Sequence, residues 1–168
     1  MNHIVKLSFF AILLMYSCDE VMPDISDPVI PESEKVVLLE ELTGASCPNC
    51  PKGTAAVEAI LEKFPGKVAA VAIHGEFLAQ PTKRSQYDFR NPKAAELEKW
   101  FAPWLGKPAA TINRIDLNSA DEKYATVATG LWQANVENEL LKPLQLNLLM
   151  DVKYTESTRL VEIDITGI

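Results

Sequence analysis

Two cysteines, Cys47 and Cys50, are separated only by Pro48 and Asn49, and they follow the apolar run 36–39. Thiols at this spacing, placed where a strand runs into the start of a helix, are suited to making and breaking a disulfide. The start of a helix stabilises a thiolate, because its first N–H groups are unpaired and carry partial positive charge. Cys47 is therefore the candidate nucleophile. Cys50, about one helical turn further on, is the candidate resolving thiol.

Other uses of such a pair need partners that the sequence can be searched for. Residue 51 is proline where a haem attachment motif has histidine. A zinc site needs two further ligands, and beyond the pair only His3, Cys18 and His74 remain as histidines or cysteines. We therefore expect no cofactor and no metal. A redox-active pair and a static structural disulfide stay open as interpretations.

The N-terminus indicates export. Residues 7–16 form an apolar run behind Lys6 that is shorter than the roughly 20 residues of a membrane span. We interpret residues 1–17 as a signal peptide. Residues 14–18 resemble a bacterial lipobox, in which Cys18 takes the lipid and becomes the new N-terminus. An ordinary signal peptide with an incidental Cys18 is the alternative.

The segment 18–34 is acidic and contains three prolines, which is typical of an extended tether. With Cys18 assigned to the lipid, the other two cysteines form one pair, as expected outside the cytoplasm. We expect attachment to the cell outer membrane, on its periplasmic side or at the cell surface. The formal net charge of −7 argues against nucleic acid as a partner, because phosphates would repel this chain.

Residues 35–142 predict one α/β domain. A buried central strand at 35–42, a helix at 51–64 and an apolar strand at 68–73 form a βαβ unit. The continuous apolar run of the second strand predicts a parallel strand covered on both faces. The cysteine pair then lies at the carboxyl end of the first strand, where open α/β sheets place their chemistry. Further along, the pattern predicts a short helix begun by Asn91-Pro92, a strand at 109–115, a short fourth strand at 115–117 and a helix at about 119–140.

The C-terminal segment 143–168 predicts an antiparallel β-hairpin. Residues 144–154 and 160–165 alternate apolar and polar side chains, with a turn at Glu156-Ser157.

This order of elements, with the cysteine pair after the first strand and a proline before the third, resembles the thioredoxin fold, which implies a central mixed sheet flanked by helices. More closely, the stretch 41–53, with Ile112-Asn113-Arg114 downstream, resembles the twenty-eight-kilodalton outer-membrane lipoprotein family over about residues 36–168. In that family a β-sandwich begins where this hairpin lies. The resemblance implies that the chain is either a fragment or a shortened relative.

The resemblance also implies roles for two residues. Pro108 would be the cis-proline opposite the cysteines, leaving the preceding carbonyl free to pair with a substrate chain. Glu41 would be a buried proton acceptor for Cys50, and its alternation with Val37 and Leu39 points it into a covered face. The alternative is that Glu41 lies in solvent at the end of the strand.

Two functions follow from these predictions. The first is a membrane-tethered thiol-disulfide oxidoreductase acting on protein thiols or disulfides. The second is a surface binding or structural lipoprotein that keeps the fold and uses the cysteines as a structural disulfide.

Overall fold

The computed structural model of the chain describes residues 35–167. The signal peptide, the lipidated Cys18 and the tether, all predicted within residues 1–34, lie outside the described residues. Within the described range, no helix has both the length and the apolar character needed to cross a membrane.

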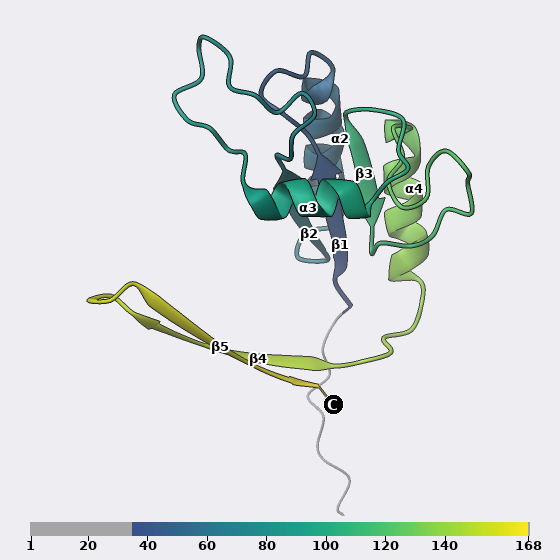
Figure 1. The fold of residues 1–168 in the computed structure, drawn as a ribbon. Coiled ribbons are helices and arrows are strands. Elements are labelled where there is room, and N and C mark those ends of the chain that lie inside the picture. The colour runs from purple at the N-terminus through teal and green to yellow at the C-terminus, as the bar shows by residue number, and fades with distance from the viewer. Residues whose placement is uncertain (1–34, 168) are drawn as a thin grey trace, which may run out of the picture. The chain divides into compact units, whose positions relative to one another are not determined.

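The centre of the fold is a three-stranded mixed sheet (Figure 1). Strand β1 (Val37–Leu42) lies in the middle, parallel to β2 (Val68–Ile73) and antiparallel to β3 (Ala109–Ile112). Five of the six residues of β1 are buried, which confirms the predicted central strand.

Helices cover both faces of this sheet, as predicted. Helices α2 (Cys50–Lys63) and α4 (Thr129–Leu140) pack on one face, and α3 (Pro92–Trp100) lies across the other (Figure 1). Each face has its own apolar core. The core under α2 and α4 consists of Val37, Leu39, Val57, Ile60, Val68, Ala110, Ile112, Trp132 and Val136. The core under α3 consists of Leu42, Ile73, Ala94, Phe101, Ala109 and Ala125.

The start of α3 was predictable from local chemistry. Asn91 is the N-cap, and its side-chain oxygen accepts a hydrogen bond from Ala94 N at 2.8 Å. Pro92 follows at the first position of the helix, where a missing N–H costs nothing.

The prediction that β2 is covered on both faces is wrong. Its end residues Val68 and Ile73 are buried, but residues 69–72 between them are exposed. The strand lies at the edge of the three-stranded sheet, while the buried cores are centred on β1. An apolar run therefore identified the strand correctly but not its place in the sheet.

Three predictions between β3 and α4 need correction. Strand β3 ends at Ile112 rather than at residue 115, because Asn113 and Arg114 adopt positive φ angles of 48° and 53°, which no strand continues. Residues 115–117 form no strand; the antiparallel partner of β3 on this side is Thr126, paired with Ala110. This pairing holds the segment before α4 in an extended form, so the helix begins at Thr129 and not near residue 119.

The C-terminal hairpin is confirmed, with β4 (Leu148–Thr155) and β5 (Leu160–Gly167) joined by a turn at 156–159. Among residues 35–167 these two strands form a sheet of their own, and all their side chains are exposed. Alternate cross-strand pairs place apolar side chains on one face. These pairs are Met150 with Ile165, Val152 with Ile163, and Tyr154 with Val161.

Candidate functional site

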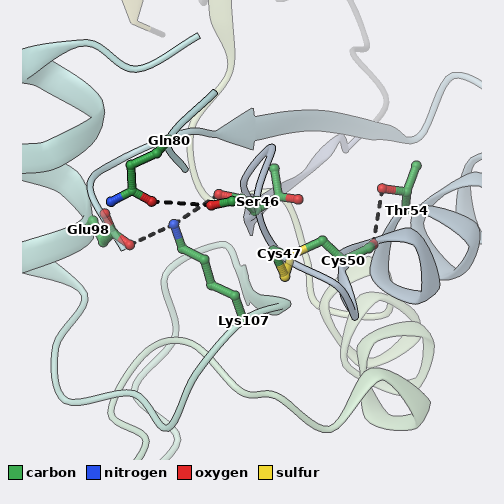
Figure 2. Close-up of a disulfide and its surroundings, with 8 residues drawn as sticks. Ser46, Cys47, Cys50, Thr54, Gln80, Glu98 and Lys107 are labelled. Atoms are coloured by element: carbon green, nitrogen blue, oxygen red, sulfur yellow. Dashed lines mark hydrogen bonds and ion pairs between the residues drawn. A yellow bond between two sulfur atoms is a disulfide. The ribbon is translucent and has the colours of Figure 1, made fainter. Parts of the chain in front are cut away.

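Cys47 and Cys50 form a disulfide, with an S–S distance of 2.11 Å and a Cα–Cα distance of 5.4 Å (Figure 2). Cys50 is the first residue of α2, and Cys47 lies in the turn before it. The helix therefore starts at the second cysteine, not at the first. Cys47 N donates to Gly44 O at 3.1 Å, which ties the first cysteine back to the end of β1.

The surroundings of the disulfide combine burial with the positive end of a helix. Cys47 is 6% exposed and Cys50 4% exposed. The first turn of α2 contains no acidic residue of its own, and its free N–H groups carry partial positive charge. A thiolate formed at this point is stabilised by those groups.

Glu41 lies on the face of β1 that is covered by α2 and α4, only 5% exposed, as its alternation with Val37 and Leu39 predicts. Burial raises the pKa of its carboxyl group from 4.5 to about 7, against the smaller opposing effect of a hydrogen bond from Thr43. Its Oε1 atom has no hydrogen-bond partner among the described residues. A carboxyl group that is half-protonated near neutral pH is able to accept or to donate a proton there.

Pro108 and Glu41 meet at the first turn of α2. The Lys107–Pro108 peptide bond is cis, and Pro108 is buried. Both residues lie close to Gly53. A Cβ atom at that position would lie 2.5 Å from Glu41 Oε1 and 2.5 Å from Pro108 Cβ. Glycine is therefore required at this helical position for the carboxylate and the proline to approach together.

An open groove of about 630 Å³ runs from the disulfide along β2. Both cysteines and Glu41 contribute to its wall, so the three residues that the sequence analysis assigned to one site line the same groove. The exposed middle of β2 supplies a mostly apolar side, and α2 supplies the opposite side. These further lining residues include Ala70, Val71 and Ala72 from β2, and Pro51, Thr54, Ala55 and Glu58 from α2.

His74 lies at the end of β2 and also lines this groove. Its pKa is lowered, first by burial and then by the positive charge of Lys107. The imidazole ring packs against Phe89, with 5.3 Å between ring centroids. A neutral, half-buried imidazole of this kind is suited to packing.

Sequence reasoning missed a buried ion pair beside the disulfide. Lys107 Nζ lies 2.7 Å from Glu98 Oε1 (Figure 2). Lys107 also donates to the carbonyl oxygen of Thr43 at 2.9 Å. A signal for Glu98 was present, since it follows Ala94 by four residues and precedes Phe101 by three on the core-facing side of α3. A charge in that stripe needs a buried partner.

Among residues 35–167 no group of three or more His, Cys, Asp or Glu side chains is placed to hold a metal ion. Comparison with protein-family models, with curated proteins and with solved structures found no match to this chain. The class of protein that fold and site define is thus a mixed α/β domain with a CxxC disulfide at the N-terminus of a helix, followed by a β-hairpin. The resemblance to the lipoprotein family stays a prediction.

Proposed function

We propose that this protein is an extracytoplasmic thiol-disulfide oxidoreductase in which Cys47 exchanges with protein thiols or disulfides. The observation that carries the proposal is the Cys47–Cys50 disulfide sharing one groove with Glu41, a buried carboxyl group whose pKa is raised to about 7. A structural disulfide does not need a proton donor or acceptor beside it. An exchange reaction does, because a thiol must lose its proton before it attacks.

The reaction begins from the disulfide form of the cysteine pair. A substrate thiolate attacks the sulfur of Cys47, the Cys47–Cys50 bond breaks, and the departing Cys50 thiolate takes a proton from protonated Glu41. A second substrate thiolate then attacks the substrate sulfur of the mixed disulfide, and Cys47 leaves as a thiolate stabilised by the N-terminus of α2. The substrate dithiol is oxidised by two electrons and the cysteine pair is reduced. In the reverse direction Glu41 accepts the proton of Cys50.

A thioredoxin-like fold is part of the proposal. The strand order β2-β1-β3, the parallel first pair, the antiparallel third strand and the cis peptide before Pro108 support it. The antiparallel bridge between Ala110 and Thr126 stands where a fourth strand would pair. On this proposal Pro108 seats the substrate chain, and the lipid on Cys18 holds the domain at the outer membrane as in the family resembled.

A second candidate function is a surface binding lipoprotein whose cysteines form a structural disulfide. Two observations favour it. Both cysteines are almost buried, and the C-terminal hairpin presents an exposed apolar face. An exposed apolar patch of this kind is typical of a binding surface.

The deciding experiment is a redox titration of the chain carrying Cys18→Ser, with alkylation of reduced Cys47 followed across pH. We expect a thiolate pKa well below about 8 and a reduction potential above roughly −270 mV, as for exchange catalysts. An ordinary thiol pKa together with a potential below about −300 mV would favour the structural disulfide.

Single substitutions assign the roles within the pair. Cys47→Ser should abolish exchange, and Cys50→Ser should accumulate mixed disulfides on Cys47. Glu41→Gln should slow the resolving step about a hundredfold, which is typical of a lost acid–base group. Glu40→Gln, on the neighbouring residue, is the matched control and should leave that step unchanged.

A further inference from the structure

The Lys107–Glu98 ion pair is the most deeply buried pair of opposite charges among the described residues. The side chain of Lys107 is 0% exposed and that of Glu98 is 7% exposed. A buried pair is weak evidence for stability, because the cost of removing two charges from water offsets their attraction. Two apolar side chains of similar size would fill this space, so the pair calls for another explanation.

The contacts of the pair supply that explanation, because they join the segments that surround the disulfide. Lys107 directly precedes Pro108, and its ammonium group donates to the Thr43 carbonyl, four residues before Cys47. Glu98 Oε2 in turn accepts the backbone N–H of Glu76, in the loop that follows β2. An apolar pair would leave both of these backbone groups without their partners.

The loop that follows β2 completes the connection on the other side of Cys47. Ser46 N donates to Leu78 O at 3.1 Å, and the Ser46 hydroxyl bonds Gln80 Oε1 at 3.2 Å (Figure 2). Gln80 is itself held by its amide, which donates to Glu76 O at 3.1 Å. Thr43 is thus connected to Glu98 through Lys107, and Ser46 is connected to Glu98 through Gln80 and Glu76.

We propose that the Lys107–Glu98 pair is a positioning device that holds the turn carrying Cys47 against the Pro108 loop and thereby sets the reactivity of the Cys47 thiol. This inference rests on the proposed oxidoreductase function. The pair acts through hydrogen bonds to other residues. Lys107 bonds the Thr43 carbonyl in this turn, and Glu98 bonds Glu76 N, which is connected to Ser46 through Gln80. The other titratable groups around the disulfide are Glu41 on β1, Glu58 on α2 and His74 after β2, and the test leaves all three unchanged.

The test compares two double variants of the chain carrying Cys18→Ser. Glu98→Gln with Lys107→Met removes both charges, keeps an acceptor for Glu76 N and fills the space of the lysine stem. Glu40→Gln with Arg114→Met is the matched control. It removes another pair with a buried carboxylate, joined at 2.7 Å, with no recorded bond to Thr43, Ser46 or Glu76. The readouts are the alkylation rate of reduced Cys47 by iodoacetamide across pH, and exchange with a small-molecule disulfide.

We expect alkylation at pH 7 to slow about tenfold in the first double variant and less than about twofold in the control, because a displaced Cys47 loses the stabilisation of the helix N-terminus. If the Lys107–Glu98 pair only stabilised the fold, its removal could lower the unfolding midpoint, but the two double variants would have the same alkylation rate at Cys47. Equal alkylation rates in the two variants overturn the inference.

A further substitution keeps the test decisive if the first double variant does not unfold cooperatively. Gln80→Ala removes the exposed bond to Ser46 and leaves the buried pair in place. It should slow alkylation about threefold, because Gln80 joins Ser46 to Glu76 and so to Glu98, and an unchanged rate overturns the part of the inference that runs through Glu98. A wild-type Cys47 with ordinary thiol reactivity and no exchange overturns the proposed function together with this inference, whereas an active wild type with unaltered variants overturns this inference alone.

Discussion

Glu40 and Glu41 are neighbours on β1 and are buried to the same degree, yet the two faces of the sheet treat their carboxylates differently. On the α3 face, Glu40 accepts two hydrogen bonds from the Arg114 guanidinium, at 2.7 and 2.8 Å. On the α2 face, Glu41 accepts a hydrogen bond from the Thr43 hydroxyl, and its Oε1 has no hydrogen-bond partner among the described residues. One sequence Glu-Glu thus contains a paired charge and an unpaired one.

Buried carboxylates that are paired with a cation stabilise the fold, whereas the unpaired carboxylate of Glu41 is available to exchange a proton. The α3 face also pairs its second buried acid, Glu98, with Lys107. On α4, the buried acid Glu139 is paired as well, with Lys142. Among the described residues, Glu41 at the disulfide is therefore the one buried acid without a cation, and its pKa rises to about 7. Perturbed acids gather at functional sites because a proton carrier needs a pKa near the working pH.

The largest effect on the free energy of unfolding is expected for the Glu40–Arg114 pair on the α3 face. Arg114→Met leaves Glu40 buried without its cation and removes the contacts of the guanidinium with Trp100 and Phe101, each 5.5 Å from the ring centroid. We expect the free energy of unfolding at pH 7 to fall by about 3 kcal/mol, at the low end for a broken buried pair because Arg114 is 40% exposed. Urea unfolding measures this. Adding Glu40→Gln should recover most of the loss, and a loss below about 0.5 kcal/mol would show that Glu40 does not depend on Arg114.

The second prediction concerns the unpaired carboxylate, Glu41, and the pH dependence that it gives to the stability of the fold. Glu41 has a pKa of about 7 in the folded protein against an ordinary value of 4.5, so the folded state binds more protons between these values. The contribution of Glu41 to stability is then largest below pH 4.5 and decreases as pH rises towards 7. We expect a decrease of about 2 kcal/mol, reduced from the full shift because the groove admits water.

Glu41→Gln should remove this decrease. Urea unfolding of both proteins at pH 5 and pH 8 checks it, with the wild type losing stability relative to the variant at the higher pH. Parallel curves would mean that Glu41 is solvated like a surface acid and that the two faces do not differ.

A third substitution probes what confines Glu41. Gly53→Ala adds a methyl group 2.5 Å from Glu41 Oε1 and from Pro108 Cβ. Overpacking costs about 1–3 kcal/mol, while alanine gains up to about 1 kcal/mol of helix propensity, so the net expectation is a loss of about 1 kcal/mol. Gly130→Ala in α4 is the control, since its Cβ would meet nothing within 4 Å and should leave stability equal or higher. If both variants gain stability in thermal unfolding, Glu41 does not pack on α2.

Much of this arrangement could be predicted because its signals are local. The βαβ unit follows from apolar runs and from the cysteines between them, and the start of α3 follows from Asn91-Pro92. Alternation along β1 predicted a covered position for Glu41, with a solvent-exposed strand end as the alternative, and the structure shows the residue buried. These features depend on neighbouring residues of the chain, so a single sequence contains them.

The features that could not be predicted depend on contacts between residues far apart in the sequence, and local sequence patterns do not indicate such contacts. The exposed middle of β2 reflects the absence of a further strand in the described sheet, not the composition of residues 69–72. The late start of α4 reflects the bridge of Thr126 to Ala110. The core-facing position of Glu98 on α3 indicates a buried charge, but its partner Lys107 lies in the loop before β3 and is identified only once the chain has folded.

The smallest effect is expected where carboxylates lie in solvent, on the hairpin. Asp151 and Asp164 are directly opposite each other across β4 and β5, and Lys153 approaches them at 3.7 and 4.0 Å. All three side chains are exposed, so water screens both the repulsion and the attraction. Lys153→Ala should therefore change the free energy of unfolding by less than about 0.5 kcal/mol, and raising the salt concentration should remove even that. A loss as large as that of Arg114→Met, in the same urea experiment, would mean that these charges are buried in the protein in solution, because only burial gives an ion pair of this geometry such an effect.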